Sequence, residues 1–142
     1  MDLEPIIARL KGAATGLKAI GGAADLDAAL AGVVPVPSAF VIPISDSASA
    51  LESTGAYDEW DWCEFGVILA VASLQGARGE AALGALVPMR RQVRAALSGW
   101  APDQDTGEPV QKTRGHLLRL DGDGRLWWMD QFRWKSFYRS NP

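Results

Sequence analysis

The chain has 142 residues, enough for one domain with a buried core, and 48% of them are hydrophobic against 22% charged, a balance typical of globular proteins. The 14 basic and 17 acidic side chains give a net charge of −3, which disfavours a protein that grips a DNA backbone. One cysteine, Cys63, excludes a disulfide within the chain, and one histidine, His116, excludes the common two-histidine metal sites.

The N-terminal segment carries no sign of a targeting signal. It begins with an acidic residue, Asp2, and lacks the apolar core of a signal peptide. No apolar stretch reaches the ~18 residues that crossing a bilayer requires. We therefore expect a protein with no membrane contact, made and assembled in the cytoplasm.

The first third of the chain predicts two helices and a short strand. Apolar residues recur at helical spacing from Leu3 to Leu10, and Pro5 is tolerated in the first turn of such a helix. A short strand is predicted over Leu17–Ile20. A second helix follows over Ala23–Ala31, with Leu26 and Leu30 as its apolar pair.

The middle of the chain predicts two strands separated by a long excursion. A buried strand is predicted over Ala39–Ile42, after two prolines that end any helix. Residues 45–59 are small and polar and predict a long loop or an extended hairpin, a kind of connection that is usually functional. Trp60–Leu74 is apolar on both faces, which predicts a central strand covered on two sides.

The last part of the chain predicts a long helix and a hairpin. Glu80–Leu97 is the main helix, and Pro88 either kinks it or marks its start. Its apolar stripe is predicted to comprise Leu83, Leu86, Val93 and Leu97. Arg114–Leu120 and Arg125–Phe137 are extended runs joined by two Asp-Gly pairs, which favour positive φ and predict an antiparallel β-hairpin.

The order of these elements predicts an α/β fold of the α+β type, in which a small mixed β-sheet carries helices packed on it. We expect a single domain over residues 1–142, with the terminal antiparallel β-hairpin as part of its sheet.

The residues that could carry chemistry do not form a recognisable site. His116 has no serine, cysteine or aspartate at a nucleophile spacing, so a sheet-face or contact histidine is the simpler interpretation. Cys63 lacks an activating partner, which favours a buried or interfacial thiol. The Asp121-Gly-Asp123-Gly motif is not a calcium loop, because the twelfth position from Asp121 is Phe132 rather than glutamate. We predict no catalytic residue, no cofactor and no metal.

Six tryptophans are the feature that core packing explains least well. Trp60 and Trp62 share one strand face, whereas Trp127 and Trp128 point to opposite faces. Tryptophan supplies large, rigid contact areas and is enriched at interfaces. The predicted subunit-interface residues are Trp60, Trp62, Trp127, Trp128, Phe132 and Trp134. The alternative is that all of them belong to the core.

Arg90, Arg91 and Arg94 form a basic patch on the main helix, with further arginines, Arg114, Arg119 and Arg125, on the nearby strands. A solvated helix face explains such a patch, and so does a contact with a partner or with passing DNA.

Several landmarks occur in an order and spacing that resemble a known family. They are the helix LEPIIARL at 3–10, the segment PVPSAFVIPI at 35–44, the helix end LSGWAP at 97–102 and the DGDG turn before LWW at 126–128. Over nearly the whole chain they resemble the tail terminator proteins of tailed bacteriophages and prophages.

This resemblance implies a non-enzymatic virion protein at the head-proximal end of the tail. It implies a ring, usually a hexamer, that docks on the last ring of tail tube protein and ends its polymerisation. The other face of the ring would meet the head–tail connector or neck protein, and DNA would be only passing cargo.

Two predictions about contacts follow from combining this resemblance with the residues. We expect the excursion to reach the tube or a neighbouring subunit through Asp46, Leu51, Glu52, Tyr57 and Asp58. We expect Arg90, Arg91 and Arg94 to face the lumen or a partner. The alternatives are a tail completion or head–tail joining protein, a DNA-binding module, and a small enzyme built on His116.

Overall fold

The computed structural model of the chain describes residues 1–32, 34–52, 55–72, 80–122 and 124–140. The described residues form three helices and five strands, in the order α1 (Glu4–Ala13), β1 (Ala19–Gly21), α2 (Ala23–Ala31), β2 (Ser38–Leu51), β3 (Tyr57–Ala72), α3 (Glu80–Leu97), β4 (Gln111–Leu120) and β5 (Arg125–Ser140). The predicted α+β class is confirmed.

All five strands belong to one mixed sheet with the strand order β1-β2-β3-β5-β4. β1 runs parallel to β2, and every other pair of neighbours is antiparallel. The predicted terminal hairpin is confirmed, because β4 pairs with β5. Gly124 closes its turn with a φ of 84°, a left-handed conformation that glycine adopts without steric cost.

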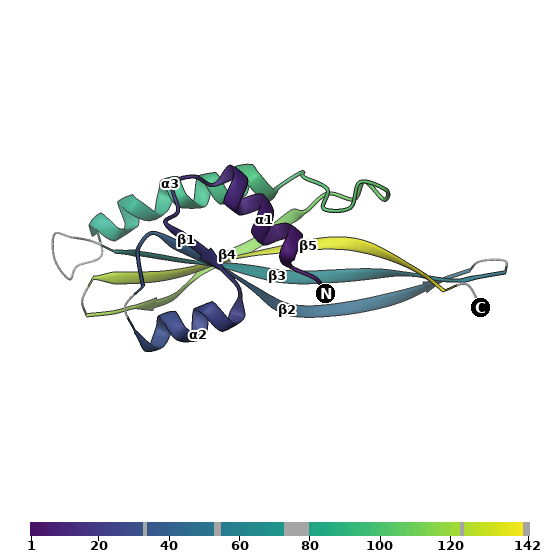
Figure 1. Ribbon diagram of the computed structural model, residues 1–142, viewed down its shortest axis with the longest axis horizontal. Coiled ribbons are helices and arrows are strands. Elements are labelled where there is room, and N and C mark those ends of the chain that lie inside the picture. The colour runs from purple at the N-terminus through teal and green to yellow at the C-terminus, as the bar shows by residue number, and fades with distance from the viewer. Residues whose placement is uncertain (33, 53–54, 73–79, 123, 141–142) are drawn as a thin grey trace.

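Helices α1 and α3 pack side by side on one face of the sheet, which we call the α1/α3 face (Figure 1). Leu86 and Val93 of α3 are buried in one cluster with Phe65 of β3 and Phe132 of β5. The rings of Phe65 and Phe132 stack with their centroids 5.6 Å apart, and neither side chain is exposed. This cluster is the main core of the protein.

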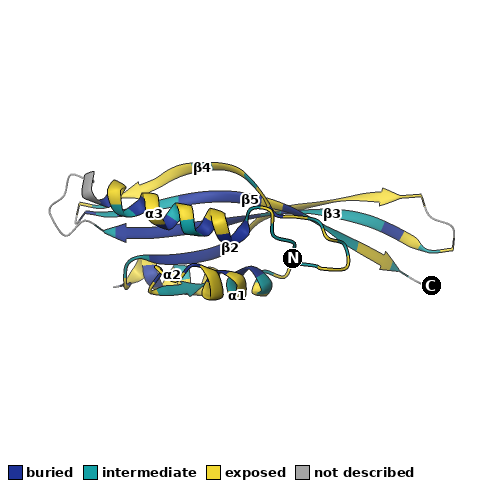
Figure 2. Ribbon diagram, turned by 90° about the horizontal axis from the view of Figure 1, so that it is seen from above, coloured by how far each residue is buried: buried dark blue, intermediate teal, exposed yellow. Residues whose placement is uncertain are grey.

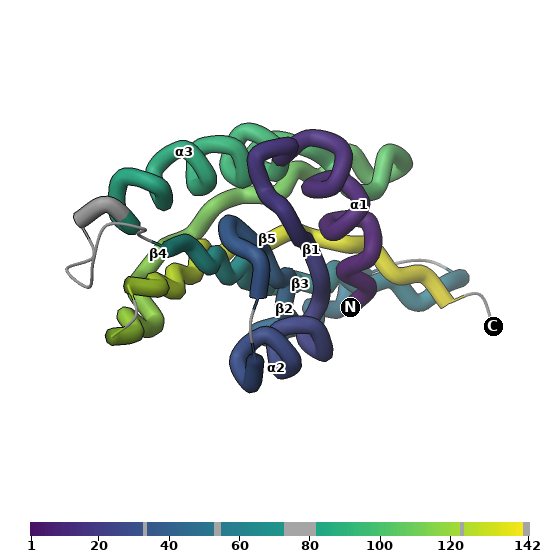
Figure 3. Tube along the Cα trace, turned by 60° about the vertical axis from the view of Figure 1, so that its left-hand side comes forward, coloured from purple at the N-terminus to yellow at the C-terminus, as the bar shows by residue number. Residues whose placement is uncertain are grey.

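Helix α2 covers part of the opposite face, the α2 face, as Figure 3 shows. A second, smaller cluster lies beneath it and includes Ala29, Phe40, Ile68 and Trp127. Trp127 is 1% exposed and stacks on Phe40 at 6.4 Å between ring centroids. The sheet is therefore covered on both faces where α2 and α3 lie, as the apolar sequence of β3 predicts.

Beyond the helices the sheet continues as a projection of three strands (Figure 1). β3 has 16 residues and spans about 50 Å, whereas the 18 residues of α3 span about 27 Å. The covered part of β3, from Phe65 to Val71, is buried throughout, but most of its outer part, from Tyr57 to Glu64, is half-exposed (Figure 2). We call the projection, made of residues 45–51, 57–64 and 133–140, the arm.

The sequence predicts either a long loop or an extended hairpin over residues 45–59. Those of them that the structure describes form the outer part of the β2–β3 hairpin, while residues 53–54 lie outside the described ranges. β1 pairs with β2 only as far as Phe40. Pro43 and an irregularity in the β2–β3 register follow shortly afterwards. Because proline has no N–H to donate, it is tolerated where a strand has lost one neighbour. The arm therefore begins where β2 becomes an edge strand.

Some details of the predicted helices were wrong. The buried stripe of α3 includes Ala82, Leu86 and Met89, whereas Leu83 is 51% exposed because its neighbour Ala82 takes the core position. Pro88, for which the sequence left two alternatives, lies inside α3 rather than at its start. In α2, Leu30 is exposed and Ala29 is buried in its place. Successive helical residues differ by about 100° in direction, so a shift of one position is enough to exchange core and surface.

Candidate interaction surfaces

The arm presents two faces of different chemistry. Residues directly opposite each other in antiparallel strands lie on the same face of a sheet. Trp60 and Trp62 of β3 pair with Phe137 and Lys135 of β5 and lie on the α2 face, like Trp127 further along the sheet. With Arg133, these residues form what we call the aromatic face of the arm: Trp60, Trp62, Arg133, Lys135 and Phe137.

The rings of the aromatic face pack against cationic side chains rather than against a helix. Lys135 Nζ lies 4.2 Å from the ring centroid of Trp60, and the Arg133 guanidinium carbon lies 4.8 Å from that of Trp62. Trp60 also packs edge-on against Phe137, with 5.2 Å between ring centroids. Cation–π contacts at exposed sites contribute about 0.5–1 kcal/mol each. Both tryptophans stay half-exposed and are available to a partner.

The opposite side of the arm, on the α1/α3 face, carries three carboxylates. Asp46 pairs with Cys63, and Ala48 pairs with Asp61, which places Asp46, Glu59 and Asp61 on one side. We call this the acidic face of the arm. Within the described strand positions of the arm, this side carries no basic residue.

The negative charges of this face act on the hydroxyl group of Tyr57. Its hydroxyl donates a hydrogen bond to Glu59 Oε2 at 2.8 Å. That hydrogen bond and the charge of Glu59 raise the pKa of Tyr57, with a smaller contribution from Asp61. Ionisation of Tyr57 would add a fourth negative charge, so the pKa rises.

Of the contact residues predicted for the excursion, Asp46 lies at the base of the arm, where it pairs with Cys63, and the others lie near its tip. Asp46, Leu51, Glu52 and Tyr57 are exposed, whereas Asp58 is 5% exposed. The Asp58 carboxylate accepts hydrogen bonds from Arg139 Nε at 2.6 Å and Nη2 at 2.8 Å. This bidentate ion pair ties β3 to β5 and raises the pKa of Arg139.

The predicted interface aromatics divide between the core and the surface. Trp127, Phe132 and Trp134 are 1%, 0% and 8% exposed. Trp128 is half-buried, and its Nε1 donates to Asp130 Oδ1 at 3.0 Å. Of these six predicted interface residues, burial within the chain therefore leaves Trp128, Trp60 and Trp62 with surface to offer.

The arginines of α3 line a cavity of about 240 Å³ together with Lys112 of β4 and Asp130 of β5. Arg90 donates from Nε to Asp130 Oδ2 at 3.1 Å and from Nη2 to Oδ1 at 2.9 Å, while Lys112 Nζ lies 3.9 Å from Oδ1. Arg91 and Arg94 make no ion pair with any described residue and are exposed. Four cations and one carboxylate leave this site, which we call the basic pocket, with a net charge of +3.

The strand arginines that the sequence associates with this patch lie elsewhere. Arg114 Nε donates to Gln131 Oε1 at 2.7 Å, and Arg119 forms an ion pair with Asp121 at 2.6 Å. Both lie outside the lining of the basic pocket. The basic site is therefore built from one helix and two strands rather than from all the arginines.

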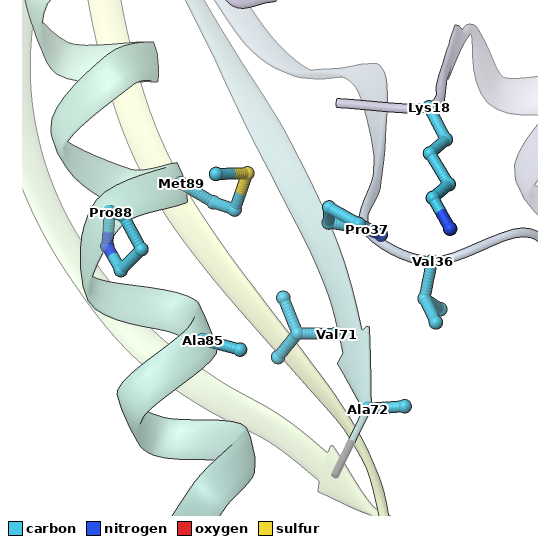
Figure 4. Close-up of a pocket in the computed structure, with 8 residues that line it drawn as sticks. All are labelled: Lys18, Val36, Pro37, Val71, Ala72, Ala85, Pro88 and Met89. Carbon is cyan, nitrogen blue, oxygen red and sulfur yellow. The ribbon is translucent and has the colours of Figure 1, made fainter. Parts of the chain in front are cut away.

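A second cavity, of about 360 Å³, is mostly apolar and lies beside α3 (Figure 4). Met89 and Ala85 of α3 line one side, and Val36 and Lys18 lie across from them. Large apolar residues are also exposed on α3 and β4, two elements that reach the end of the body opposite the arm (Figure 1). They are Leu83, Val87, Leu117 and Leu120, and we call this region the apolar end. Grouped apolar residues of this kind mark contact surfaces.

The residues that could take part in catalysis or metal binding lie apart from one another. Cys63 is 4% exposed, and its burial raises the pKa of the thiol. His116 is exposed on β4, opposite Met129. The described residues contain no group of three or more histidine, cysteine, aspartate or glutamate side chains placed to hold a metal ion. Asp123 of the predicted turn lies outside the described residues.

None of the helices in the described ranges combines the length and the apolar character needed to cross a bilayer.

A small α+β domain with a projecting arm, a basic pocket and an apolar end is built to make contacts with other macromolecules. The model of the phage tail terminator protein family matches residues 1–142, and the chain belongs to that family. It is a non-enzymatic structural component of the virion tail, and the resemblance found in the sequence is confirmed.

Comparison with solved structures supports the fold. A chain in the virion of a native gene transfer agent (GTA) particle is similar, with a TM-score of 0.54 and 12% sequence identity, over 92% of this chain and 90% of that chain. No curated protein sequence matches the chain.

Sequence reasoning missed Lys112 and Asp130 as parts of the basic pocket. A signal for Asp130 exists, because it lies between Trp128 and Phe132 on the buried side of an alternating strand. A carboxylate at such a position requires a cationic partner. The arginines of α3 were the cationic residues available to pair with Asp130.

Proposed function

We propose that the chain is the subunit of a ring, usually of six copies in such proteins, that caps the tail tube. The ring ends polymerisation of the tube protein on one side and offers a docking surface to the head–tail connector on the other. The family supports this proposal, and the arm is the structural observation that carries it. A strand projection without a covering helix gains its remaining burial from another molecule.

The two ends of the molecule give this proposal distinct surfaces. The arm offers half-exposed tryptophans on its aromatic face, together with Asp46 at its base and Leu51, Glu52 and Tyr57 near its tip. The apolar end offers Leu83, Val87, Leu117 and Leu120. Surfaces at opposite ends of a subunit suit a ring that has a neighbour on each side.

The first experiment measures the mass of the purified chain alone and mixed with tube protein, followed by imaging of tube ends. We expect a closed ring, or a ring that forms only on tube ends, and tubes that stop growing. A chain that stays monomeric and leaves tube growth unchanged would overturn the proposal. Rings found only on the connector side would indicate a head–tail joining protein instead.

A double variant tests the part played by the arm. Trp60→Ser with Trp62→Ser removes two half-exposed rings while leaving the covered core intact, so the chain should fold but no longer cap tubes. Leu30→Ser is the matched control, because it removes an exposed apolar side chain from α2. Capping by the double variant at the wild-type level would show that the aromatic face is not the contact.

A further inference from the structure

We propose that the basic pocket binds the carboxylates of the acidic face on the arm of a second copy of this chain. The proposal rests on the proposed ring and names one of its contacts. The pocket is formed by Arg90, Arg91, Arg94, Lys112 and Asp130. Its ligand is a pair of side-chain carboxylates supplied by the arm.

The pocket is preorganised by a buried carboxylate. Asp130 is 2% exposed and accepts hydrogen bonds from both Arg90 and Trp128. The Arg90 guanidinium carbon in turn lies 4.5 Å from the ring centroid of Trp128. A Cβ atom at Gly115 would collide with the Asp130 carboxylate and would lie 3.1 Å from both Arg90 Nη2 and Trp128 Nε1. The absence of a side chain at Gly115 therefore makes room for this network.

This arrangement divides the cations into two groups with different roles. Arg90 is engaged with Asp130 and forms the wall of the pocket, whereas Arg91 and Arg94 have no carboxylate partner in the described part of the chain. Guanidinium groups bind carboxylates through paired, charge-assisted hydrogen bonds. The site therefore has unused capacity for an anionic group.

Two observations favour carboxylates over the phosphates of DNA. The cations surround a cavity of about 240 Å³, which suits one or two side chains, whereas a DNA backbone needs a row of cations along an open surface. The chain as a whole has a net charge of −3 and carries an acidic face on its arm, which would repel a polyanion.

The acidic face of the arm supplies a complementary ligand. Asp46, Glu59 and Asp61 provide three negative charges against the net +3 of the pocket. The arm points away from the body that holds its own pocket, so the match is available between copies rather than within one (Figure 1). Interfaces with matched charges gain specificity and a faster association.

Charge reversal on each side tests the contact. The pocket variant is Arg91→Glu with Arg94→Glu, and the arm variant is Glu59→Lys with Asp61→Lys. Each should weaken self-association, measured by sedimentation at low salt and on tube ends, by about a hundredfold, because close charge pairs at interfaces contribute strongly. The chain that carries all four reversals should assemble again, since attraction is restored with the signs exchanged.

Lys11→Glu with Lys18→Glu is the matched control, because it makes the same charge change on the body outside the basic pocket. Circular dichroism checks that every variant is folded. Rings that form and cap tubes equally well with each reversed pair would overturn the pocket–arm contact and leave the proposed ring intact. A wild-type chain that neither self-associates nor caps tubes would overturn both. Salt-sensitive binding of a short DNA duplex, lost in the pocket variant while assembly is unchanged, would assign the pocket to phosphates instead.

Discussion

The body and the arm share three strands but are stabilised in different ways. In the body, the segment of β3 from Phe65 to Val71 is buried on both faces by helices and neighbouring side chains. In the arm, the same strand from Tyr57 to Glu64 is mostly half-exposed. Its tryptophan rings contact cations, and the ion pair between Asp58 and Arg139 joins it to β5. The pairing of β3 with β5 is continuous through both parts, whereas the pairing of β2 with β3 has an irregularity between Pro43 and Ser45, where the arm begins.

This difference shows that strand pairing sets the shape of the sheet while helix coverage decides where its stability lies. Burial of apolar area is the dominant favourable contribution to folding, whereas exposed charge contacts add little. We therefore expect substitutions in the body to affect the free energy of unfolding. Substitutions in the arm should affect binding instead.

The sharpest test compares two phenylalanines of the same strand. Phe132→Ala removes a fully buried ring stacked on Phe65 and should cost about 3–5 kcal/mol in the free energy of unfolding. Phe137→Ala, in the arm, removes an edge-on contact with Trp60 and should cost about 1 kcal/mol. Urea unfolding of both variants measures the difference. Equal losses of unfolding free energy would mean that the ring in the arm stabilises the fold as much as the ring in the body does.

A glycine pair tests the network at the basic pocket. Gly115→Ala places a methyl group against the Asp130 carboxylate and should destabilise the protein by about 1–3 kcal/mol. Gly84→Ala, in α3, meets nothing within 4 Å and should stabilise it by about 0.5–1 kcal/mol. Thermal unfolding of the two variants gives the sign of each change. A neutral Gly115→Ala would show that the network tolerates the added group.

A single substitution on the aromatic face separates stability from binding. Trp62→Ala removes contacts with Arg133 and Lys135 and should lower the free energy of unfolding by only about 1 kcal/mol. Its effect on capping of tube ends should be large, because tryptophan dominates many interfaces. Denaturant unfolding and counts of capped tubes test the two halves of this prediction. A variant with strongly reduced stability and normal capping would contradict this prediction, because the aromatic face would then support folding rather than binding.

The smallest predicted effect lies at the junction of the two regions. Burial raises the pKa of Cys63 in the folded chain, so its contribution to stability is fully present below the ordinary thiol pKa of about 8.5 and is lost as the pH rises through the folded value. We expect slow alkylation of the native chain and a slightly lower stability at about pH 9.5 than at about pH 7. In Cys63→Ala this decrement should disappear. Fast alkylation of the native thiol would contradict its burial.

Much of the fold follows from local sequence. The Asp-Gly pairs at 121–124 predicted the β4–β5 hairpin, and the two apolar faces of β3 predicted a central strand. The extent of the arm did not follow. The segment from Asp46 to Leu51 is rich in serine and alanine, residues that do not favour strands. Its strand conformation comes from pairing with β3, which local propensity does not describe.

Only the helical part of the basic pocket could be predicted from the sequence, for a related reason. The spacing of Arg90, Arg91 and Arg94 indicates a basic helix, but not which neighbours complete it. Lys112 and Asp130 come from two strands, β4 and β5, and meet the arginines only where α3 packs on the sheet. Such a site depends on contacts between residues distant in sequence.

The outer strand of the sheet, β4, bears on whether the protein itself could start a fibre. β4 has a free edge, and Leu117, Leu118 and Leu120 on it are exposed. An open edge of this kind can template further strands and start a fibre. Two breaks in the β4–β5 register, near Thr113 and Leu118, together with the charges of Arg114 and Arg119, make this edge a poor template. A cap of the kind proposed for this chain can therefore end one polymer without seeding another.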